Sequence, residues 1–305
     1  MSKKTLENAR IAKDDEFYTK YEDIVNEMSF YTSELRDKTI YCNCDDPRFS
    51  QFWAYFHDNF HSLGLKHLIA TYFDCYNPVF RYDYDGVSIK KERLDFGFGD
   101  FSSLDCEMIL DEADIVISNP PFSKFTEYVS LLLRHDCKFI ILGSNLASTY
   151  SVLVDSIISG VVRSTYPLCS SGNCSNPEMH FTRPDGSDAK VACCWFSNVQ
   201  STKPYNKLSL LDYYDIEQYK RYDNMYDCIE VPDLKSIPCY YNGKFGVPVT
   251  ILNSYDLSEY EILEIDRHLR INDKQVFNRV IMRRKQPKLS CSLSDVFHNF
   301  LNNVR

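Results

Sequence analysis

Residues 114–122 have the sequence DIVISNPPF, in which an apolar run meets two consecutive prolines. The run at 114–118 is short and contains three β-branched residues, which predicts a buried strand. Proline fixes its own φ, lacks an N–H donor and restricts the preceding residue to extended geometry. The carbonyl groups of Asn119 and Pro120 are therefore expected to be held rigidly after this strand, with no local donor competing for them.

Strand-like and helix-like segments alternate on both sides of this stretch. Apolar runs at 39–42, 67–73 and 138–142 predict strands, and 48–63 and 125–134 have apolar residues at helical spacing. Residues 93–98 are expected to lead to a further short strand that ends near Asp100, and Pro248 predicts an edge position for a strand over 245–252. The alternation predicts an α/β fold with a mostly parallel sheet and helices on both faces.

Polar side chains follow the predicted strands at the edge where the carboxyl ends of those strands meet. They are Asp45 and Asp46, Asp74, Asp100 and Asn119. Ligands of open parallel sheets bind outside the carboxyl ends of the strands. The shared placement predicts one ligand site at this edge, although Asp46 is equally suited to cap the helix that follows it.

The tetrapeptide Asn119-Pro120-Pro121-Phe122 suits the activation of a planar exocyclic amine. Such an amine is a poor nucleophile because its lone pair is delocalised into the ring. Hydrogen bonds from its N–H groups to the Asn119 side-chain oxygen and the Pro120 carbonyl favour a tetrahedral nitrogen, whose lone pair points at an electrophile. Phe122 offers a stacking surface for a base flipped out of a duplex. The alternative is an ordinary turn between a strand and a helix, which the same residues also fit.

Several segments together resemble a known family, the EcoRI-type adenine-specific DNA methyltransferases. They occur in order as DEFYT at 15–19, YCNCDDPR at 41–48, GDF at 99–101 and NPPF at 119–122, and then as YDN at 222–224, GVPVTIL at 246–252 and RINDK at 270–274. The resemblance spans roughly residues 13–288. The second segment is unusual because it has no glycine where methyltransferases of this fold usually have a glycine-rich turn.

The resemblance implies a Rossmann-like class I fold that uses S-adenosylmethionine as the methyl donor. Phe17, Tyr18 and Thr19 match the segment that borders the methionine end of the cofactor. Asp45, Asp46 and Asp100 match residues on the cofactor side of the family's site. Asp74 is added because an acid at a strand end can bind ribose hydroxyls. Asn119, Pro120, Pro121 and Phe122 match the catalytic motif. The expected organisation is a catalytic domain over 1–200 and a C-terminal DNA-recognition extension over 201–305.

The charge of the chain is unevenly distributed. The net charge of −9 argues against a nonspecific nucleic-acid coat, but residues 267–288 hold eight Lys/Arg and one acid, so they carry +7 and the rest carries −16. We expect nucleic-acid contact from the cations at its C-terminal end, which are Arg279, Arg283, Arg284, Lys285 and Lys288. The alternatives are a solvated charged face or a strand edge protected by charge.

Other functions are compatible with the motif. Methyltransferases of RNA adenine or protein glutamine also act on a planar amine, and a catalytically silent module that binds cofactor or DNA is a further alternative. The basic segment favours nucleic acid over protein, the intact NPPF motif argues against a silent module, and only the resemblance favours DNA over RNA. It further implies a monomer acting on double-stranded DNA, and it is compatible with a cognate restriction endonuclease that makes no direct contact with it.

The cysteines and the hydropathy indicate the cellular compartment. The chain has 12 cysteines, no signal peptide at its start and no apolar stretch of about 18 residues, which predicts reduced thiols in the cytoplasm and no membrane span. No pair of CxxC knuckles is present, so we expect no metal site. Direct transfer to an amine also requires no cysteine nucleophile.

Overall fold

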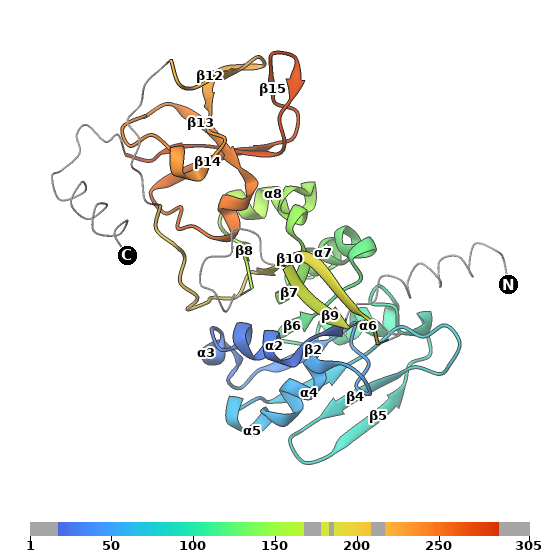
Figure 1. Cartoon of the computed structure of the whole chain (residues 1–305). Helices are drawn as coiled ribbons and strands as arrows, with labels where there is room; N and C mark the ends of the chain where they lie inside the picture. Colours follow the sequence, from blue (N-terminus) through green and yellow to red (C-terminus); the bar gives the residue numbers. More distant parts are fainter. Residues whose placement is uncertain (1–17, 168–177, 183–185, 209–216, 287–305) are drawn as a thin grey trace. The chain divides into compact units, whose positions relative to one another are not determined.

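The computed structural model describes residues 18–167, 178–182, 186–208 and 217–286 (Figure 1). The chain divides into two compact units, one made of residues 1–147 and 162–203 and the other of residues 148–161 and 204–305. Each unit contains its own sheet. No helix in the described ranges is long and apolar enough to cross a membrane.

The first unit contains a ten-stranded sheet with its helices. The strands are β1 (Tyr18–Thr19), β2 (Thr39–Cys42), β3 (His67–Ala70), β4 (Phe80–Tyr84), β5 (Ile89–Arg93), β6 (Ile115–Ser118), β7 (Lys138–Ser144), β8 (Arg163–Thr165), β9 (Glu178–Thr182) and β10 (Asp188–Ser197). The helices are α2 (Tyr21–Met28), α3 (Thr32–Leu35), α4 (Gln51–Asp58), α5 (Phe60–Leu63), α6 (Leu104–Leu110) and α7 (Phe125–Arg134), with 3-10 turns η1 (Gly97–Gly99), η2 (Phe122–Lys124) and η3 (Asn145–Thr149).

The four central strands of this sheet are parallel and lie in the order β3-β2-β6-β7. The chain moves outward from β2 to β3, returns to the other side of β2 for β6 and then continues outward to β7. The strand order therefore reverses between β2 and β6. Such a reversal is the topological switch point, outside whose carboxyl ends open α/β sheets bind their ligands.

Antiparallel strands flank this parallel centre. The hairpin β4–β5 extends the sheet beyond β3, and β10, β8, β9 and β1 extend it beyond β7. The sheet as a whole is thus mixed, and the predicted parallel pairing holds only for its centre. The short strand predicted to end near Asp100 is wrong, because β5 ends at Arg93 and the η1 turn holds Gly97, Phe98 and Gly99 at positive φ, which no extended strand has.

Both faces of the central strands are covered. Ile40, Leu68, Ile117 and Ile140 belong to one core cluster with side chains of α2 and α4. Successive residues of a strand point to opposite faces, and their neighbours on the other face are also buried, namely Tyr41, Ile69, Val116 and Ile141. Burial on both faces explains why these strands are continuous apolar runs in the sequence.

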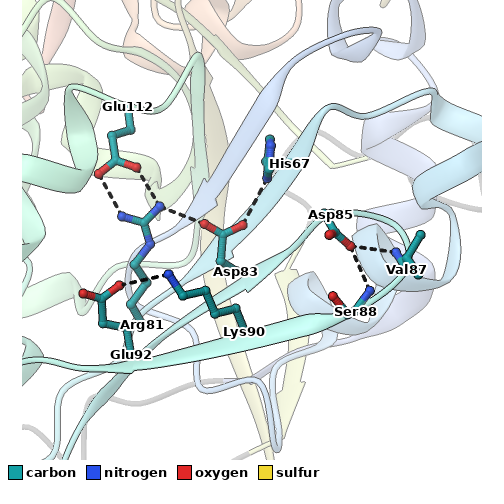
Figure 2. A network of polar contacts seen from close by, with 9 residues as sticks. All are labelled: His67, Arg81, Asp83, Asp85, Val87, Ser88, Lys90, Glu92 and Glu112. Carbon is teal, nitrogen blue, oxygen red and sulfur yellow. Dashed lines mark hydrogen bonds and ion pairs between the residues drawn. The ribbon is translucent and has the colours of Figure 1, made fainter.

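A polar network fixes the hairpin β4–β5 to the sheet (Figure 2). The Arg81 guanidinium on β4 donates to Glu112 Oε1 at 2.8 Å and to Asp83 Oδ2 at 2.8 Å. The other oxygen of Asp83 lies 3.1 Å from His67 Nδ1 on β3. The network therefore links β3, β4 and the turn after α6.

The second unit contains a five-stranded sheet in the order β11-β12-β13-β17-β14. Its elements are α8 (Ser151–Ile158), β11 (Arg221–Tyr222), β12 (Met225–Glu230), η4 (Leu234–Ser236), β13 (Lys244–Pro248), η5 (Val249–Asn253), β14 (Tyr260–Asp266), β15 (Arg270–Ile271), β16 (Lys274–Gln275) and β17 (Arg279–Arg284). The edge position predicted from Pro248 is wrong, because β13 lies between β12 and β17. Pro248 is tolerated there because it is the last residue of β13, beyond the residues paired with β12.

Candidate active site

Two turns meet at the switch point of the first unit. The turn after β2 contains Asn43, Cys44, Asp45 and Asp46, and the turn after β6 contains the NPPF motif, residues 119–122. β2 and β6 pair directly, with Tyr41 opposite Val116. The acidic turn and the NPPF motif, 73 residues apart in the chain, therefore leave the same edge of the sheet side by side.

Asp45 joins the two turns through buried hydrogen bonds. Its Oδ2 accepts from Ser118 Oγ at 2.6 Å and its Oδ1 accepts from Ser50 Oγ at 2.7 Å. Ser50 in turn caps α4 by accepting from the backbone N–H groups of Phe52 and Trp53. Burial raises the pKa of Asp45 to about 6, although the two serine hydroxyls act in the opposite direction. Both Asp45 oxygens are thus engaged within the protein.

Ser118 is a site residue that the sequence reasoning missed. It is the last residue of β6, is fully buried, and receives the N–H of Cys44 at 3.2 Å while donating to Asp45. The signal in the sequence is a single hydroxyl at the end of an otherwise apolar strand. These bonds fix the residue that immediately precedes Asn119.

The NPPF motif forms the bend between β6 and α7. Asn119 is partly buried with its side-chain oxygen shielded from solvent, and Pro120 is buried. Pro121 has φ −60° and ψ 125°, so the chain remains extended until Phe122 begins η2. Phe122 is partly buried and packs against the core cluster of the first unit. The bend has the rigid, extended geometry expected of consecutive prolines.

Asp100 is held to the residues just after this motif. Its Oδ2 accepts from Lys124 Nζ at 2.7 Å, and its Oδ1 accepts from the backbone and hydroxyl of Ser102. Burial raises the pKa of this carboxyl, but the bonds from Lys124 and Ser102 outweigh burial and leave the pKa below its ordinary value. Lys124 is a second residue that the sequence reasoning missed. Asp100 is therefore an anionic acceptor beside the NPPF motif.

Asp74 lies on a loop that contacts the loop of Asp100. The Asp74 N–H donates to the Phe98 carbonyl at 3.0 Å, and a Cβ on Gly99 would lie 2.1 Å from the Tyr72 carbonyl oxygen, so only glycine permits this approach. The Asp74 carboxylate accepts from the Asn77 side chain and from two backbone N–H groups. Burial raises its pKa, but these bonds outweigh burial and lower the pKa below the ordinary value.

Asp46 forms an ion pair with the arginine two residues after it. Arg48 donates through Nε to both oxygens of Asp46, at 2.9 and 3.0 Å, and its guanidinium lies 5.1 Å from the centre of the Tyr72 ring. The positive charge of Arg48 also contributes to the low pKa of Asp74. Asp46, Arg48 and Asp74 thus form the β2–β3 side of the site.

Cys44 belongs to the acidic turn, and the charges of both Asp45 and Asp100 act on its thiol. Burial raises the pKa of its thiol well above the ordinary value, and the carboxylates of Asp45 and Asp100 raise it further. The structure therefore brings Asp45 and Asp100 close to one thiol, although they are 55 residues apart in the chain. A thiol in this environment is protonated and a poor nucleophile.

Two buried polar atoms near the upstream segment and the acidic turn have no hydrogen-bond partner in the described part of the chain. They are Thr19 Oγ1 on β1 and Asn43 Nδ2. The other amide atom of Asn43, its oxygen, accepts from the Tyr128 hydroxyl. Buried polar groups are normally paired, so each offers a contact to a ligand. Tyr18 pairs with Thr182 on β9, and Phe17 lies outside the described residues.

The predicted nucleic-acid contacts belong to the second unit and fall into two classes. Arg279 is buried and donates to Glu230 at 2.7 Å, and Arg284 is buried over the Tyr260 ring. Arg283 and Lys285 are exposed, and Arg283 donates to Glu261 at 2.7 Å. Both arginines belong to β17, which lies between β13 and β14, and their side chains are internal rather than on the surface. Lys288 lies outside the described residues.

No group of three or more His, Cys, Asp or Glu side chains within the described ranges is arranged to hold a metal ion.

Comparison with known proteins gives consistent matches along the chain. The model of a family described as adenine-specific methyltransferase EcoRI matches residues 5–95 and 79–296. Type II methyltransferase M.EcoRI of Escherichia coli is 33% identical over 320 residues, which cover 93% of this chain and 97% of that protein. Type II methyltransferase M.MgeORF184P of Mycoplasma genitalium and M.MpnI of Mycoplasma pneumoniae are 34% and 32% identical, each covering 84% of both chains. No solved structure matches the chain.

Proposed function

The chain belongs to the adenine-specific methyltransferase EcoRI family, and on that premise we propose that it transfers a methyl group from S-adenosylmethionine to the exocyclic amine of adenine in double-stranded DNA. The observation that carries the proposal is the position of Asn119–Pro120–Pro121–Phe122 at the switch point, beside the acidic turn after β2. This is where a parallel sheet of this order binds its ligands.

The strand order also supports a Rossmann-like class I methyltransferase fold for the first unit. The order of its parallel strands reverses between β2 and β6, and acidic residues follow the carboxyl ends of β2 and β3. We propose that the second unit, which joins residues 148–161 to residues 204–305, is the DNA-recognition extension, whereas the sequence predicts a single division at residue 200. A monomer is sufficient for this activity, since all the proposed catalytic residues lie in one chain.

The residues at the switch point fit S-adenosylmethionine. When bound, this cofactor supplies an electrophilic methyl group on a sulfonium. Asp74 and Asp100 have lowered pKa values and are anionic acceptors for ribose hydroxyls and for the adenine amine of the cofactor. Tyr18, Thr19 and Phe17 border its methionine end, where the buried Thr19 hydroxyl offers a contact. Of the two acids in the turn after β2, Asp46 keeps the cofactor role because it is only partly buried, whereas Asp45 is buried between Ser50 and Ser118 and positions the turn.

The NPPF motif activates the substrate amine. The Asn119 side-chain oxygen and the Pro120 carbonyl accept its two N–H groups, which favours a tetrahedral nitrogen with an available lone pair. Pro120 and Pro121 keep these acceptors fixed, so little reorganisation is needed during the reaction. As the nitrogen forms its bond to the methyl carbon, the carbon–sulfur bond would break and leave a neutral thioether, and the nitrogen would then release one proton to water. No covalent bond to the protein forms.

Phe122 stacks on the target base after it has been flipped out of the duplex. An adenine inside a base-paired helix has its amine engaged with the opposite base, so extrusion must precede transfer. Phe122 follows Pro121 directly and is only partly buried, which leaves ring surface for stacking. A stack of this kind contributes about 1–3 kcal/mol to base capture.

Methyl transfer with product analysis tests the proposal. Purified protein is incubated with labelled S-adenosylmethionine and mixed-sequence DNA, RNA or protein, and the products are digested and separated. The proposal predicts label in methylated adenine from DNA. Label in RNA adenine or protein glutamine alone would replace DNA with that substrate, and cofactor binding without any transfer would identify a silent module.

A further inference from the structure

Two segments of the second unit that lie about 46 residues apart in the chain build one structural element. β15 and β16 form a two-stranded hairpin, which we call the basic hairpin and define as residues 267–275 (orange-red in Figure 1, label β15). The turn between β11 and β12 contains Asp223 and Asn224 and contacts it. Both segments carry family-like motifs in the sequence, and neither is used by the proposed chemistry.

The tip of the basic hairpin is a tight, ordered turn. Asn272 and Asp273 have φ 51° and 60°, and positive φ at both central residues is the requirement of a type I′ turn. Asn and Asp tolerate this left-handed conformation better than other residues with side chains. A two-residue turn of this type matches the twist of the two strands, so the ribbon is well defined rather than loose.

The turn at residues 223–224 holds the hairpin backbone in place. The Asp223 N–H donates to the Arg270 carbonyl at 2.8 Å, and the Asp223 carboxylate accepts the Asp273 N–H at 2.8 Å. The Asn224 side-chain oxygen accepts the Arg270 N–H at 3.2 Å. The backbone of Arg270 is thus fixed on both its N–H and its carbonyl, which determines where its side chain leaves the ribbon.

The strand register decides which side chains face outward. Arg270 lies opposite Gln275, and Ile271 lies opposite Lys274, so each pair shares one face of the ribbon. Ile271 packs against the buried cluster that contains Tyr222 and Ile281. Arg270 and Gln275 therefore leave the face that points away from this cluster.

The cations of the basic hairpin differ from those of β17 in their partners. Arg267, Arg270 and Lys274 form no ion pair and no side-chain hydrogen bond with any residue that the structure describes, and Arg270 and Lys274 are exposed. By contrast Arg279, Arg283 and Arg284 each pair with a glutamate. Among the described cations of residues 267–285, those without an ion pair are thus the three on the hairpin and Lys285, and the hairpin cations lie five or more residues before Arg279, where the region of predicted DNA contact begins.

We propose that the basic hairpin enters the major groove of the target DNA, where Arg270 reads a base edge and Arg267 and Lys274 contact phosphates. The proposal rests on the proposed function, since it names how the same enzyme finds its DNA site. The major groove is wide enough for a two-stranded ribbon. An arginine with a fixed backbone and a free fork-shaped guanidinium suits bidentate contact with the O6 and N7 atoms of guanine. Flanking cations are attracted to the negatively charged phosphates on either side of the groove.

Site mapping and salt titration of the full chain separate these roles. A random-sequence duplex library is methylated by the wild-type protein, by Arg270→Ala and by Arg270→Lys, and methylated adenines are mapped by sequencing. DNA affinity is then measured against salt concentration for Arg267→Ala and Lys274→Ala. The control Lys66→Ala removes an exposed charge just before β3, at the opposite edge of the sheet from the proposed active site.

Each variant has a distinct expected result. Arg270→Ala and Arg270→Lys lose about 10- to 100-fold of the preference at one base pair of the site and keep the preference elsewhere. Arg267→Ala and Lys274→Ala keep the same preferred target sequence. Each makes the fall of log affinity with log salt less steep, by about 1 in the slope. Lys66→Ala changes neither property, and thermal unfolding midpoints stay close to that of the wild type, since the replaced side chains make no ion pair and no side-chain hydrogen bond with any described residue.

Other results overturn the inference. Unchanged site preference in Arg270→Ala, or full preference in Arg270→Lys, removes the base-reading role. Unchanged salt slopes in Arg267→Ala and Lys274→Ala remove the phosphate role. In all these cases the wild type still methylates DNA, so the proposed function stands; a wild-type protein that leaves no methylated adenine in DNA contradicts the proposed function itself.

Discussion

Ser118 Oγ lies 2.6 Å from Asp45 Oδ2, and both residues are buried. One residue closes β6 just before Asn119, and the other belongs to the turn after β2. The proposed catalytic motif and the proposed cofactor turn are therefore parts of one hydrogen-bonded assembly, and a change on one side is expected to reach the other.

Ser118→Ala tests this coupling. The substitution leaves one oxygen of a buried carboxyl unsatisfied, which costs about 1–3 kcal/mol of unfolding free energy. We expect weaker binding of S-adenosylmethionine and slower methyl transfer together, measured by calorimetry and single-turnover kinetics. Ser130→Ala is a matched control because Ser130 is exposed on α7 and bonds only to a carbonyl of its own helix. An unchanged affinity and rate in Ser118→Ala would show that the two turns act independently.

Asp45→Asn tests the buried carboxyl through pH. The pKa of Asp45 is raised from 3.8 to about 6 in the folded chain, so between these values the folded state holds a proton that the unfolded state has lost. The contribution of Asp45 to stability is therefore greatest below pH 3.8 and is lost as the pH rises to about 6. Denaturant unfolding at several pH values should show the wild type losing stability relative to Asp45→Asn across this window. A constant difference between the two proteins would contradict the raised pKa, and Asp155→Asn, at an exposed site on α8, serves as the control.

The sequence predicts the centre of the fold well for a physical reason. Strands buried on both faces are continuous apolar runs, so β2, β3, β6 and β7 are visible without a structure, and the acids that follow β2 and β3 and Asn119 after β6 mark one edge. The hairpin β4–β5 is not visible in this way, because β5 is exposed along its whole length and has the sequence IKKER.

Contacts between distant residues account for most of what the sequence does not reveal. Lys124 is an ordinary charged residue until η2 places it against Asp100. Arg279 and Arg284 resemble surface cations until β17 is placed in the interior of a sheet, where Glu230 and Tyr260 surround them. The pattern of charge shows that residues 267–288 are basic, but only tertiary packing shows which of those charges reach the surface.

Lys124→Met tests the link between Asp100 and the NPPF motif. Loss of the ammonium group raises the pKa of Asp100 and removes the bond that orients its carboxylate. Because this ion pair is partly exposed, we expect only about a two- to fivefold loss of S-adenosylmethionine affinity, which increases as the pH is lowered. Lys138→Met, at the exposed start of β7, should bind the cofactor normally. Equal affinity for wild type and Lys124→Met at every pH would contradict the role assigned to Asp100.

Cys44→Ser tests direct transfer against a covalent mechanism. Cys44 is the cysteine of the acidic turn, and burial together with Asp45 and Asp100 raises the pKa of its thiol. A protonated thiol is a poor nucleophile, so Cys44→Ser should keep turnover within about a few-fold of the wild type. Loss of all turnover with intact folding and cofactor affinity would require a cysteine in the reaction.

The most direct test of the account is a single-turnover comparison of the wild type with Asn119→Ala on DNA, together with the S-adenosylmethionine affinity of both proteins. Removal of one preorganised hydrogen-bonding group at a reacting centre typically slows the chemical step by about 10²–10³-fold. The account predicts a loss of this size in methyl transfer to adenine with cofactor affinity unchanged within about twofold. An Asn119→Ala protein that methylates adenine at the wild-type rate would contradict the assignment of this asparagine as the acceptor of the substrate amine.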